Sequence, residues 1–147
     1  MTPDELGAAM AASVPFVKTV GYQVVAINAY EVTVTVPNRH ELHNHIGTAH
    51  AAAVFGAAET ATGAVLLNAI GDRLGRLVPV LKDAQIKYTA PAVGVVSAVA
   101  KPRQDPSVVI DACLDEGRAL LDVDCTLLSE DGSVNAESAF TWYLKKQ

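Results

Sequence analysis

The chain is short of cysteine, and this limits what can hold it together. It has only Cys113 and Cys125, and their positions match neither a zinc-ligand pair nor a disulfide framework. Both lie in apolar stretches, so we expect them to be small residues of the core. With 147 residues, half of them hydrophobic, the chain is long enough for one domain, which we expect to span residues 1–147.

The N-terminus lacks the pattern of a secretion signal. Residues 1–5 are acidic, whereas a signal peptide starts with a basic region followed by an apolar one. The only long apolar run, residues 49–70, is mostly alanine and glycine and contains His50, Glu59 and Asn68, which disfavours a membrane span. We therefore expect a cytoplasmic protein with no membrane partner.

Positive charge is also scarce. The formal net charge is −5, which argues against nucleic acid as a partner. Residues 73–103 nevertheless carry six basic side chains and one acidic one, and the candidates for an anionic ligand among them are Lys82, Lys87, Lys101 and Arg103. A local basic segment on an acidic protein suits a small anion better than a polymer. The alternative is a solvated strand face, and the sequence does not decide between the two.

The first third of the chain contains signals for a helix and two strands. Thr2 and Glu5 form a capping-box pair around Pro3, so we predict a helix that runs to about Lys18 and is followed by a stop at Gly21. Residues 22–28 and 31–36 are rich in β-branched side chains, and valine alternates with threonine in the second segment. This pattern is typical of half-buried antiparallel strands.

The last half of the chain predicts four more strands and a short helix. Residues 77–90 and 93–100 are predicted as strands joined by a turn at Pro91 and Gly94. Asp105 followed by proline indicates a helix that ends at Gly117. Two further strands, 119–127 and 134–144, alternate apolar and polar residues across a hairpin turn at Asp131-Gly132.

Between these parts lies a predicted helix over residues 51–70, stopped by Gly71. Small or apolar residues occupy every side of it, so it must be covered on all sides. A curved antiparallel sheet wrapped around this central helix provides such cover, which predicts an α+β fold. Glu59 lies in the middle of the helix, and a charge at such a position needs a functional reason.

The segment before this helix matches a known pattern. It reads Asn44-His45-Ile46-Gly47-Thr48-Ala49-His50-Ala51, and Glu59 follows Ala51 by eight residues. The chain resembles the hotdog-fold acyl-CoA thioesterases, especially the phenylacetate-pathway type and a related thioesterase-like branch. In that type Asn-x-x-Gly-x-x-His-Gly-Gly precedes an acidic residue on the central helix. Residues 86–94 also look like the strand and turn that follow the helix there, so the resemblance covers nearly the whole chain.

Three positions depart from the family pattern. Ala51 and Ala52 replace the paired glycines, and Gly63 stands where one branch has a threonine one turn after its glutamate. The predicted helix at 106–116 looks like an insertion relative to the simplest members. These departures bear on the rate of turnover more than on the fold.

The resemblance implies hydrolysis of an acyl-CoA thioester without a cofactor or metal. Glu59 would act as general base or nucleophile, with its pKa raised by the apolar surroundings. The Ala51 amide, in the first turn of a helix, would bind the oxyanion. Asn44 and His50 would orient the thioester or the water, and the expected substrate contacts include Gly47, Thr48 and the four basic residues.

The spacing of Ala51 and Glu59 makes a prediction about assembly. Eight residues of helix separate them by roughly 12 Å along the axis, so one chain cannot easily place both on one carbonyl. We expect a homodimer in which Ala51 of one chain faces Glu59 of the other. Two such dimers could pair into a tetramer.

Three other functions are alternatives to acyl-CoA hydrolysis: metal binding, dehydration and acyl-CoA binding without cleavage. The spacing of His40, His43, His45 and His50 matches no common zinc pattern, which favours a site without metal. His45 and Glu59, fourteen residues apart, look like the pair of hotdog hydroxyacyl-thioester dehydratases, although the proline-rich pattern around that pair is absent. A third reading is a domain that binds acyl-CoA without cleaving it.

Overall fold

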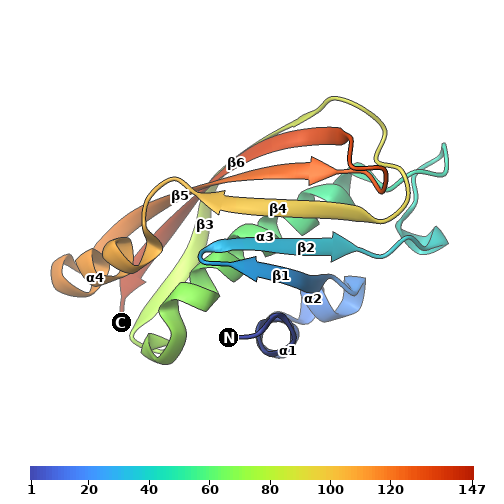
Figure 1. Ribbon diagram of the computed structural model, residues 1–147. Coiled ribbons are helices and arrows are strands. Elements are labelled where there is room, and N and C mark those ends of the chain that lie inside the picture. The colour runs from blue at the N-terminus through green and yellow to red at the C-terminus, as the bar shows by residue number, and fades with distance from the viewer.

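The computed structural model describes residues 1–147 and contains four helices and one six-stranded sheet (Figure 1). The helices are α1 (Pro3–Ser13), α2 (Pro15–Val20), α3 (Ala51–Ile70) and α4 (Pro106–Glu116). The strands are β1 (Gln23–Asn28), β2 (Glu31–Val36), β3 (Leu77–Tyr88), β4 (Val96–Pro102), β5 (Arg118–Leu128) and β6 (Val134–Lys146).

The sheet is antiparallel throughout, in the order β1-β2-β4-β5-β6-β3. It curves over α3, and α1 and α2 lie beneath its β1 edge, while α4 lies at the far end (Figure 1). A curved antiparallel sheet around one long helix is the hotdog fold, so the predicted α+β hotdog class is confirmed. β3, with twelve residues, is bonded only to β6 and forms one edge of the sheet.

The predicted N-terminal helix is two helices. The capping box of Thr2 and Glu5 is present, but α1 ends at Ser13 and α2 starts at Pro15. Val14 between them is extended, with φ −123° and ψ 96°. Pro15 has no N–H to donate and forces the residue before it out of the helical region, which explains the break.

A second correction concerns β3 and β4. The turn signals at Pro91 and Gly94 are present in the loop, but the two strands do not pair with each other. β3 pairs with β6, whereas β4 lies between β2 and β5. Strand pairing depends on contacts far apart in the sequence, and a turn signal between two strands does not specify it.

The core lies between α3 and the concave face of the sheet. Alternate residues of each strand point inward, such as Val32, Val34 and Val36 of β2. Cys113 and Cys125 are buried and free, as expected for small core residues. By length and composition Ala51–Arg73 could cross a membrane, but 61% of the apolar window within it is buried in the fold, where α3 forms the core helix.

One side of α3 is not covered. Ala52 is exposed, and Phe55, Glu59, Gly63 and Leu67 are half-buried, at spacings of three or four residues. This row of five residues, which we call the open stripe, lies on one face of the helix. The expectation that the sheet covers α3 on all sides is therefore wrong for a single chain, because six strands curve around only part of the helix.

Candidate active site

Glu59 stands in the middle of the open stripe. Its side chain is half-buried and forms no hydrogen bond or ion pair with any residue of the chain. Burial raises the pKa of its carboxyl above the ordinary value, because a charge is poorly solvated among apolar groups. Nearby Thr62 is occupied elsewhere, since its hydroxyl donates to the Glu59 backbone oxygen at 3.0 Å. The carboxylate is therefore free to act on a ligand.

Two glycines make room for aromatic rings on either side of Glu59. A Cβ added at Gly56 would lie 2.2 Å from the Tyr22 hydroxyl oxygen, and one added at Gly63 would lie 3.3 Å from the Trp142 ring. Gly56 and Gly63 are three residues before and four residues after Glu59, so all three share one helix face. Glycine at these positions lets Tyr22 and Trp142 approach the α3 backbone closely.

Both rings are fixed by hydrogen bonds. The Tyr22 hydroxyl donates to the backbone oxygen of Ala53 at 2.8 Å, and Trp142 Nε1 donates to Thr62 Oγ1 at 3.0 Å. Burial, and then the negative charge of Glu59, raises the pKa of Tyr22, so its hydroxyl stays protonated. Glu59 thus lies between two rigid aromatic walls.

The first turn of α3 offers an unused donor. His50 is the N-cap, and its Nδ1 accepts a hydrogen bond from the Ala52 N–H at 2.9 Å. The Ala51 N–H has no acceptor in the chain. The Tyr88 hydroxyl donates to the Ala51 backbone oxygen at 2.9 Å, which ties this turn to the end of β3. The free N–H of Ala51 at the positive end of a helix can bind an oxyanion.

Asn44 is occupied by its own loop. Its Oδ1 accepts from the backbone N–H groups of Ile46 and Thr48, and its Nδ2 donates to Thr48 Oγ1 at 2.8 Å. Gly47 adopts φ 77° in this turn, a conformation that glycine tolerates well. The loop therefore uses Asn44, Gly47 and Thr48 to shape the approach to the Ala51 amide.

Two separate cavities adjoin these two groups. The smaller, of about 160 Å³, is lined by Asn44, Thr48, Ala51 and Tyr88, among others. The larger, of about 300 Å³, contains Glu59 and is otherwise mainly apolar. Because the Ala51 amide and the Glu59 carboxylate open into different cavities, the structure does not bring them together within one chain.

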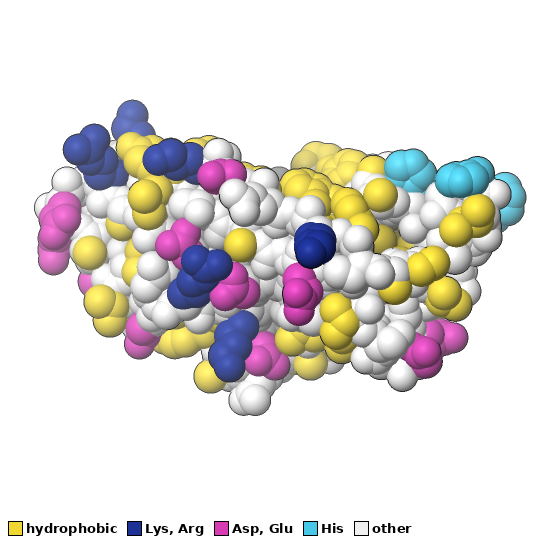
Figure 2. Space-filling model, turned by 90° about the horizontal axis from the view of Figure 1, so that it is seen from above, with side chains coloured by type: hydrophobic (Ala, Val, Ile, Leu, Met, Phe, Trp, Pro, Cys, Tyr) yellow, Lys and Arg dark blue, Asp and Glu magenta, His cyan; other side chains and the backbone are white.

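The four basic candidates are dispersed. Lys87 precedes Tyr88 in β3 but lines a different cavity, with Gln85 and Glu137, whereas Lys82 is in the middle of β3. Lys101 lies in the last part of β4 and Arg103 directly follows that strand, where Arg103 forms an ion pair with Asp124 at 2.6 Å. In Figure 2 most lysines and arginines of the visible face lie away from the histidines, and several have acidic neighbours.

The histidines gather at one end of the molecule (Figure 2). His43 Nε2 is 2.7 Å from Asn38 Oδ1, and His45 is exposed on the loop before α3. No group of three or more His, Cys, Asp and Glu side chains is arranged to hold a metal ion. The four histidines all lie in residues 40–50, the segment that leads into α3.

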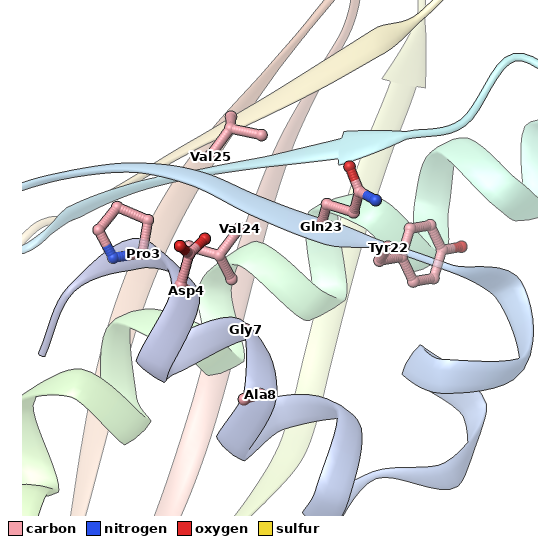
Figure 3. A pocket seen from close by; sticks show the side chains of 8 residues that line it. All are labelled: Pro3, Asp4, Gly7, Ala8, Tyr22, Gln23, Val24 and Val25. Atoms are coloured by element: carbon pink, nitrogen blue, oxygen red, sulfur yellow. The ribbon is translucent and has the colours of Figure 1, made fainter.

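A larger open groove, of about 530 Å³, lies elsewhere, between α1 and β1 (Figure 3). Its polar side chains are Asp4, Gln23 and Tyr22, and Figure 3 shows the Tyr22 ring reaching from β1 toward α3. The Tyr22 hydroxyl is already bonded to α3. Glu59, the predicted base, does not line this groove. The one carboxylate of the groove belongs to Asp4, which is exposed.

Residues 4–144 match the family described as Domain of unknown function (DUF4442). The chain belongs to the DUF4442 family. No curated protein matches it.

Solved structures with the same fold include proteins named as thioesterases. A protein of unknown function from Pseudomonas aeruginosa, named a probable thioesterase, has a TM-score of 0.83 at 23% identity, over 100% of this chain and 97% of that one. A thioesterase from Haemophilus influenzae has a TM-score of 0.79 at 18% identity, over 99% and 92%. A thioesterase family protein from Silicibacter pomeroyi has 0.77 at 16%, over 98% of both. Likeness at these identities establishes the hotdog fold of this DUF4442 chain.

Three aromatic residues of this DUF4442 site were missed by the sequence analysis: Tyr22, Tyr88 and Trp142. They come from three different strands or strand ends, and each reaches α3 through one hydrogen bond. Aromatic residues are few in this chain, and the helix that carries Glu59 contains a glycine on either side of it, at positions 56 and 63. Those two facts were the available signal, because glycine within a helix often marks close approach of another group.

Proposed function

We propose that this protein is a homodimeric hydrolase of acyl-CoA thioesters, with two equivalent sites built from both chains. The observation that carries the proposal is the Glu59 carboxylate, which lies half-buried in a mainly apolar cavity with no partner and a raised pKa. A carboxylate that stabilised the fold would be paired. A general base benefits from both features, since they bring its pKa nearer to neutral pH. The solved structures of the same fold that are named thioesterases give further support.

The reaction needs a base and an oxyanion donor on one carbonyl. Glu59 takes a proton from water as the water oxygen attacks the thioester carbon, or its carboxylate attacks that carbon itself. In the second route loss of the CoA thiolate leaves an anhydride between Glu59 and the acyl group, and water then hydrolyses it to free acid and the Glu59 carboxylate. The carbonyl oxygen becomes negative and is held by the Ala51 N–H of the other chain. The carbon–sulfur bond then breaks, and the CoA thiolate takes up a proton. Asn44 and His50 keep the Ala51 turn in position through their loop and cap bonds.

The free edge of β3 supports a specific way of joining two chains. Tyr88 at one end of β3 lines the smaller cavity, and Pro79 near the other end lines the larger one. If two β3 edges pair antiparallel about a twofold axis, the Tyr88 end of one strand lies beside the Leu77 end of the other. The smaller cavity of one chain then meets the larger cavity of its partner, and the open stripe is covered.

Charge favours the same pairing. Lys82 and Asp83 are both exposed at the centre of β3. Antiparallel pairing about that centre brings Lys82 of each chain near Asp83 of the other, so opposite charges face each other. A long unpaired edge strand is otherwise exposed to uncontrolled pairing, and dimerisation removes this edge.

Lys87 is our candidate for the CoA phosphates, because it is exposed and directly precedes Tyr88, which lines the smaller cavity. Its own side chain lines a separate cavity beside Glu137. A phosphate contact made by an exposed lysine is screened by salt. We therefore expect CoA binding to weaken as salt rises and to weaken further in Lys87→Ala. An affinity independent of salt would remove this role.

Mixed dimers test the proposal most directly. Glu59→Gln removes the base, and Ala51→Pro removes the oxyanion donor. Proline is tolerated at the first helical position, and His50 before it is already extended, with φ −63° and ψ 140°. Each variant alone should lose hydrolysis. An equal mixture, unfolded and refolded together, should recover about one quarter of wild-type activity, since half the dimers then hold one intact site of two.

Two results would contradict the proposal. Mixed dimers without any recovery, despite exchange of chains, would place the whole site in one chain. Undiminished hydrolysis by Glu59→Gln would remove the assigned base. Tight acyl-CoA binding by the wild type without hydrolysis would instead favour the non-catalytic binder. Sedimentation of the same samples reports whether the protein is a dimer or a tetramer.

A further inference from the structure

The cavity beside Glu59 continues along the C-terminal half of α3. Its walls come from one face of that helix, from α1 and the start of α2, and from the sheet. The residues used below are Gly63, Leu67 and Ile70 of α3, Trp142 of β6, Ser13 of α1 and Leu74 after α3. The cavity therefore has a defined direction, from the carboxylate of Glu59 at one end toward Leu74 at the other.

Beyond Glu59 the cavity offers almost nothing polar to a ligand. Glu59 is its only charged residue. The Ser13 hydroxyl is already used, because it donates to the backbone oxygen of Ala9 at 2.7 Å. A hydroxyl or carboxylate on the tail of an acyl group would lose its water and find no partner here. The cavity thus selects for unsubstituted hydrocarbon.

The length and the volume of the cavity both indicate an acyl chain of intermediate size. From Glu59 to Ile70, α3 rises about 16 Å at 1.5 Å per residue. An extended chain gains roughly 1.2 Å per bond, so about thirteen bonds fit along this wall. The volume of about 300 Å³ holds about ten groups if each takes the roughly 30 Å³ of a liquid water. A single aromatic ring would fill only the first part of the cavity.

Gly63 and Trp142 set the width just past the carboxylate. The Trp142 ring is held by Thr62, and glycine at 63 leaves its face toward the cavity without a covering side chain. A Cβ at 63 would already lie 3.3 Å from two ring atoms. Any larger side chain must project into the cavity or displace the ring. Gly63, which departs from the threonine of the related branch, therefore keeps the passage open.

We propose that this cavity binds a straight, saturated acyl chain of about eight to twelve carbons, with Gly63 and Trp142 as the residues that determine specificity. The proposal rests on the function proposed above, because the thioester carbonyl is taken to lie at Glu59. From there the acyl chain runs toward Ile70, and CoA leaves in the opposite direction.

The first test measures kcat/KM for linear acyl-CoA substrates from two to sixteen carbons, with phenylacetyl-CoA and 3-hydroxydecanoyl-CoA beside them. The value of kcat/KM should rise about fourfold per carbon up to the optimum, which is the worth of one buried methylene. It should fall at least tenfold by sixteen carbons. A maximum at acetyl-CoA or phenylacetyl-CoA would overturn the proposal and leave the hydrolase function intact.

Variants at the two ends of the cavity should move the optimum in opposite directions. Gly63→Val should lower kcat/KM for decanoyl-CoA at least tenfold and change that for butyryl-CoA little. Gly63→Ala serves if the valine variant folds poorly. Leu74→Ala, at a side chain that is 59% exposed, should shift the optimum to longer chains. Val108→Ala is the control, since Val108 is 64% exposed on α4. An unchanged profile in both cavity variants would exclude this location.

The second test does not require turnover. Trp142 is the only tryptophan, so its fluorescence reports on this cavity alone. S-decyl-CoA, a thioether that cannot be hydrolysed, should change the emission saturably and bind at least about a hundredfold more tightly than S-ethyl-CoA. Binding without hydrolysis of any acyl-CoA would keep the cavity assignment and end the proposed activity. Equal affinities for the two thioethers would end the assignment.

Discussion

At the first turn of α3 nearly every polar side chain has a partner within the chain, whereas Glu59, two turns further on, has none. Asn44 bonds Ile46 and Thr48, and His50 caps Ala52. The Ala51 N–H is left over in that turn. Around Glu59 the chain instead provides glycines and aromatic walls and leaves the carboxylate unpaired.

This difference separates residues that build the site from residues that act in it. Three residues of the motif at 44–50, Asn44, Gly47 and His50, are recognisable in the sequence, yet they serve the shape of the loop and the cap of α3. The Ala51 amide and the Glu59 carboxylate are the two groups of the predicted site that are left without partners. In a folded protein polar groups that are shielded from water are normally bonded, so the unpaired Glu59 carboxylate in its apolar cavity is where a ligand is expected.

The largest expected effect is on Glu59 itself. Glu59→Gln keeps the size of the side chain but removes its ability to accept a proton, so hydrolysis should fall at least about a hundredfold. Thiol release from acyl-CoA measures this, with circular dichroism to show that the fold is kept. If the variant keeps a tenth or more of the activity, Glu59 is not the base, and its lack of a partner does not mark a catalytic residue.

The glycine before Glu59 should affect stability strongly. Gly56→Ala places a Cβ 2.2 Å from the Tyr22 hydroxyl, and relief requires movement of a buried ring, at a cost of about 2–3 kcal/mol in the free energy of unfolding. Urea denaturation measures the loss. Gly63→Ala, with its nearest contact at 3.3 Å, is the matched control and should lose less than half as much.

A double variant checks the cause. Tyr22→Phe removes the hydroxyl that meets the new Cβ, so Gly56→Ala should cost less in that background. Equal costs in both backgrounds would mean that close approach of Tyr22 is not the reason for glycine at 56.

Asn44 should act through the loop. Asn44→Ala removes three hydrogen bonds, and we expect a loss of about 1–2 kcal/mol in stability together with weaker hydrolysis. Asn44→Asp keeps the oxygen that accepts from Ile46 and Thr48, so it should recover most of both. If Asn44→Asp restores stability but not activity, the Nδ2 group contacts substrate instead.

The smallest effect is a dependence of stability on pH. Burial raises the folded-state pKa of Glu59 above its ordinary value of 4.5, so the folded state holds this proton more tightly than the unfolded state. The stability that this proton contributes is complete below pH 4.5 and is lost as pH rises through the folded pKa. Glu59→Gln should therefore melt a few degrees above the wild type at pH 7 and equal to it at pH 4. A difference in melting temperature that grows as the pH falls would contradict the burial of the Glu59 carboxyl.

Local signals were enough to locate most elements. The capping box of α1, the Gly71 stop of α3, the Asp105 cap of α4 and the Asp131-Gly132 hairpin all lie where they were predicted. Each depends on residues within a few positions of one another. Pro15 is also a local signal, because proline disfavours helical backbone at the residue before it, so the prediction of one helix running to Lys18 was wrong.

The long-range features could not be obtained in this way. Nothing near β3 in the sequence says that it pairs with β6 and leaves its other edge free. Tyr22, Tyr88 and Trp142 lie far apart along the chain and meet only on α3. The open stripe likewise depends on how far the sheet curves, which is a property of the assembled strands.

The sequence by itself determined the α+β class, the central helix, Glu59 as its unusual charge, and the spacing from Ala51 that argues for two chains. These follow from periodicity, caps and helical rise, which are short-range quantities, while the hotdog class was implied by the resemblance of residues 44–59 to a known family. Only the tertiary structure decided which aromatic rings enclose Glu59, that Asn44 is occupied by its own loop, and where the apolar cavity leads. Those outcomes depend on the packing of segments distant in the chain, because a side chain's partners are set by the whole fold.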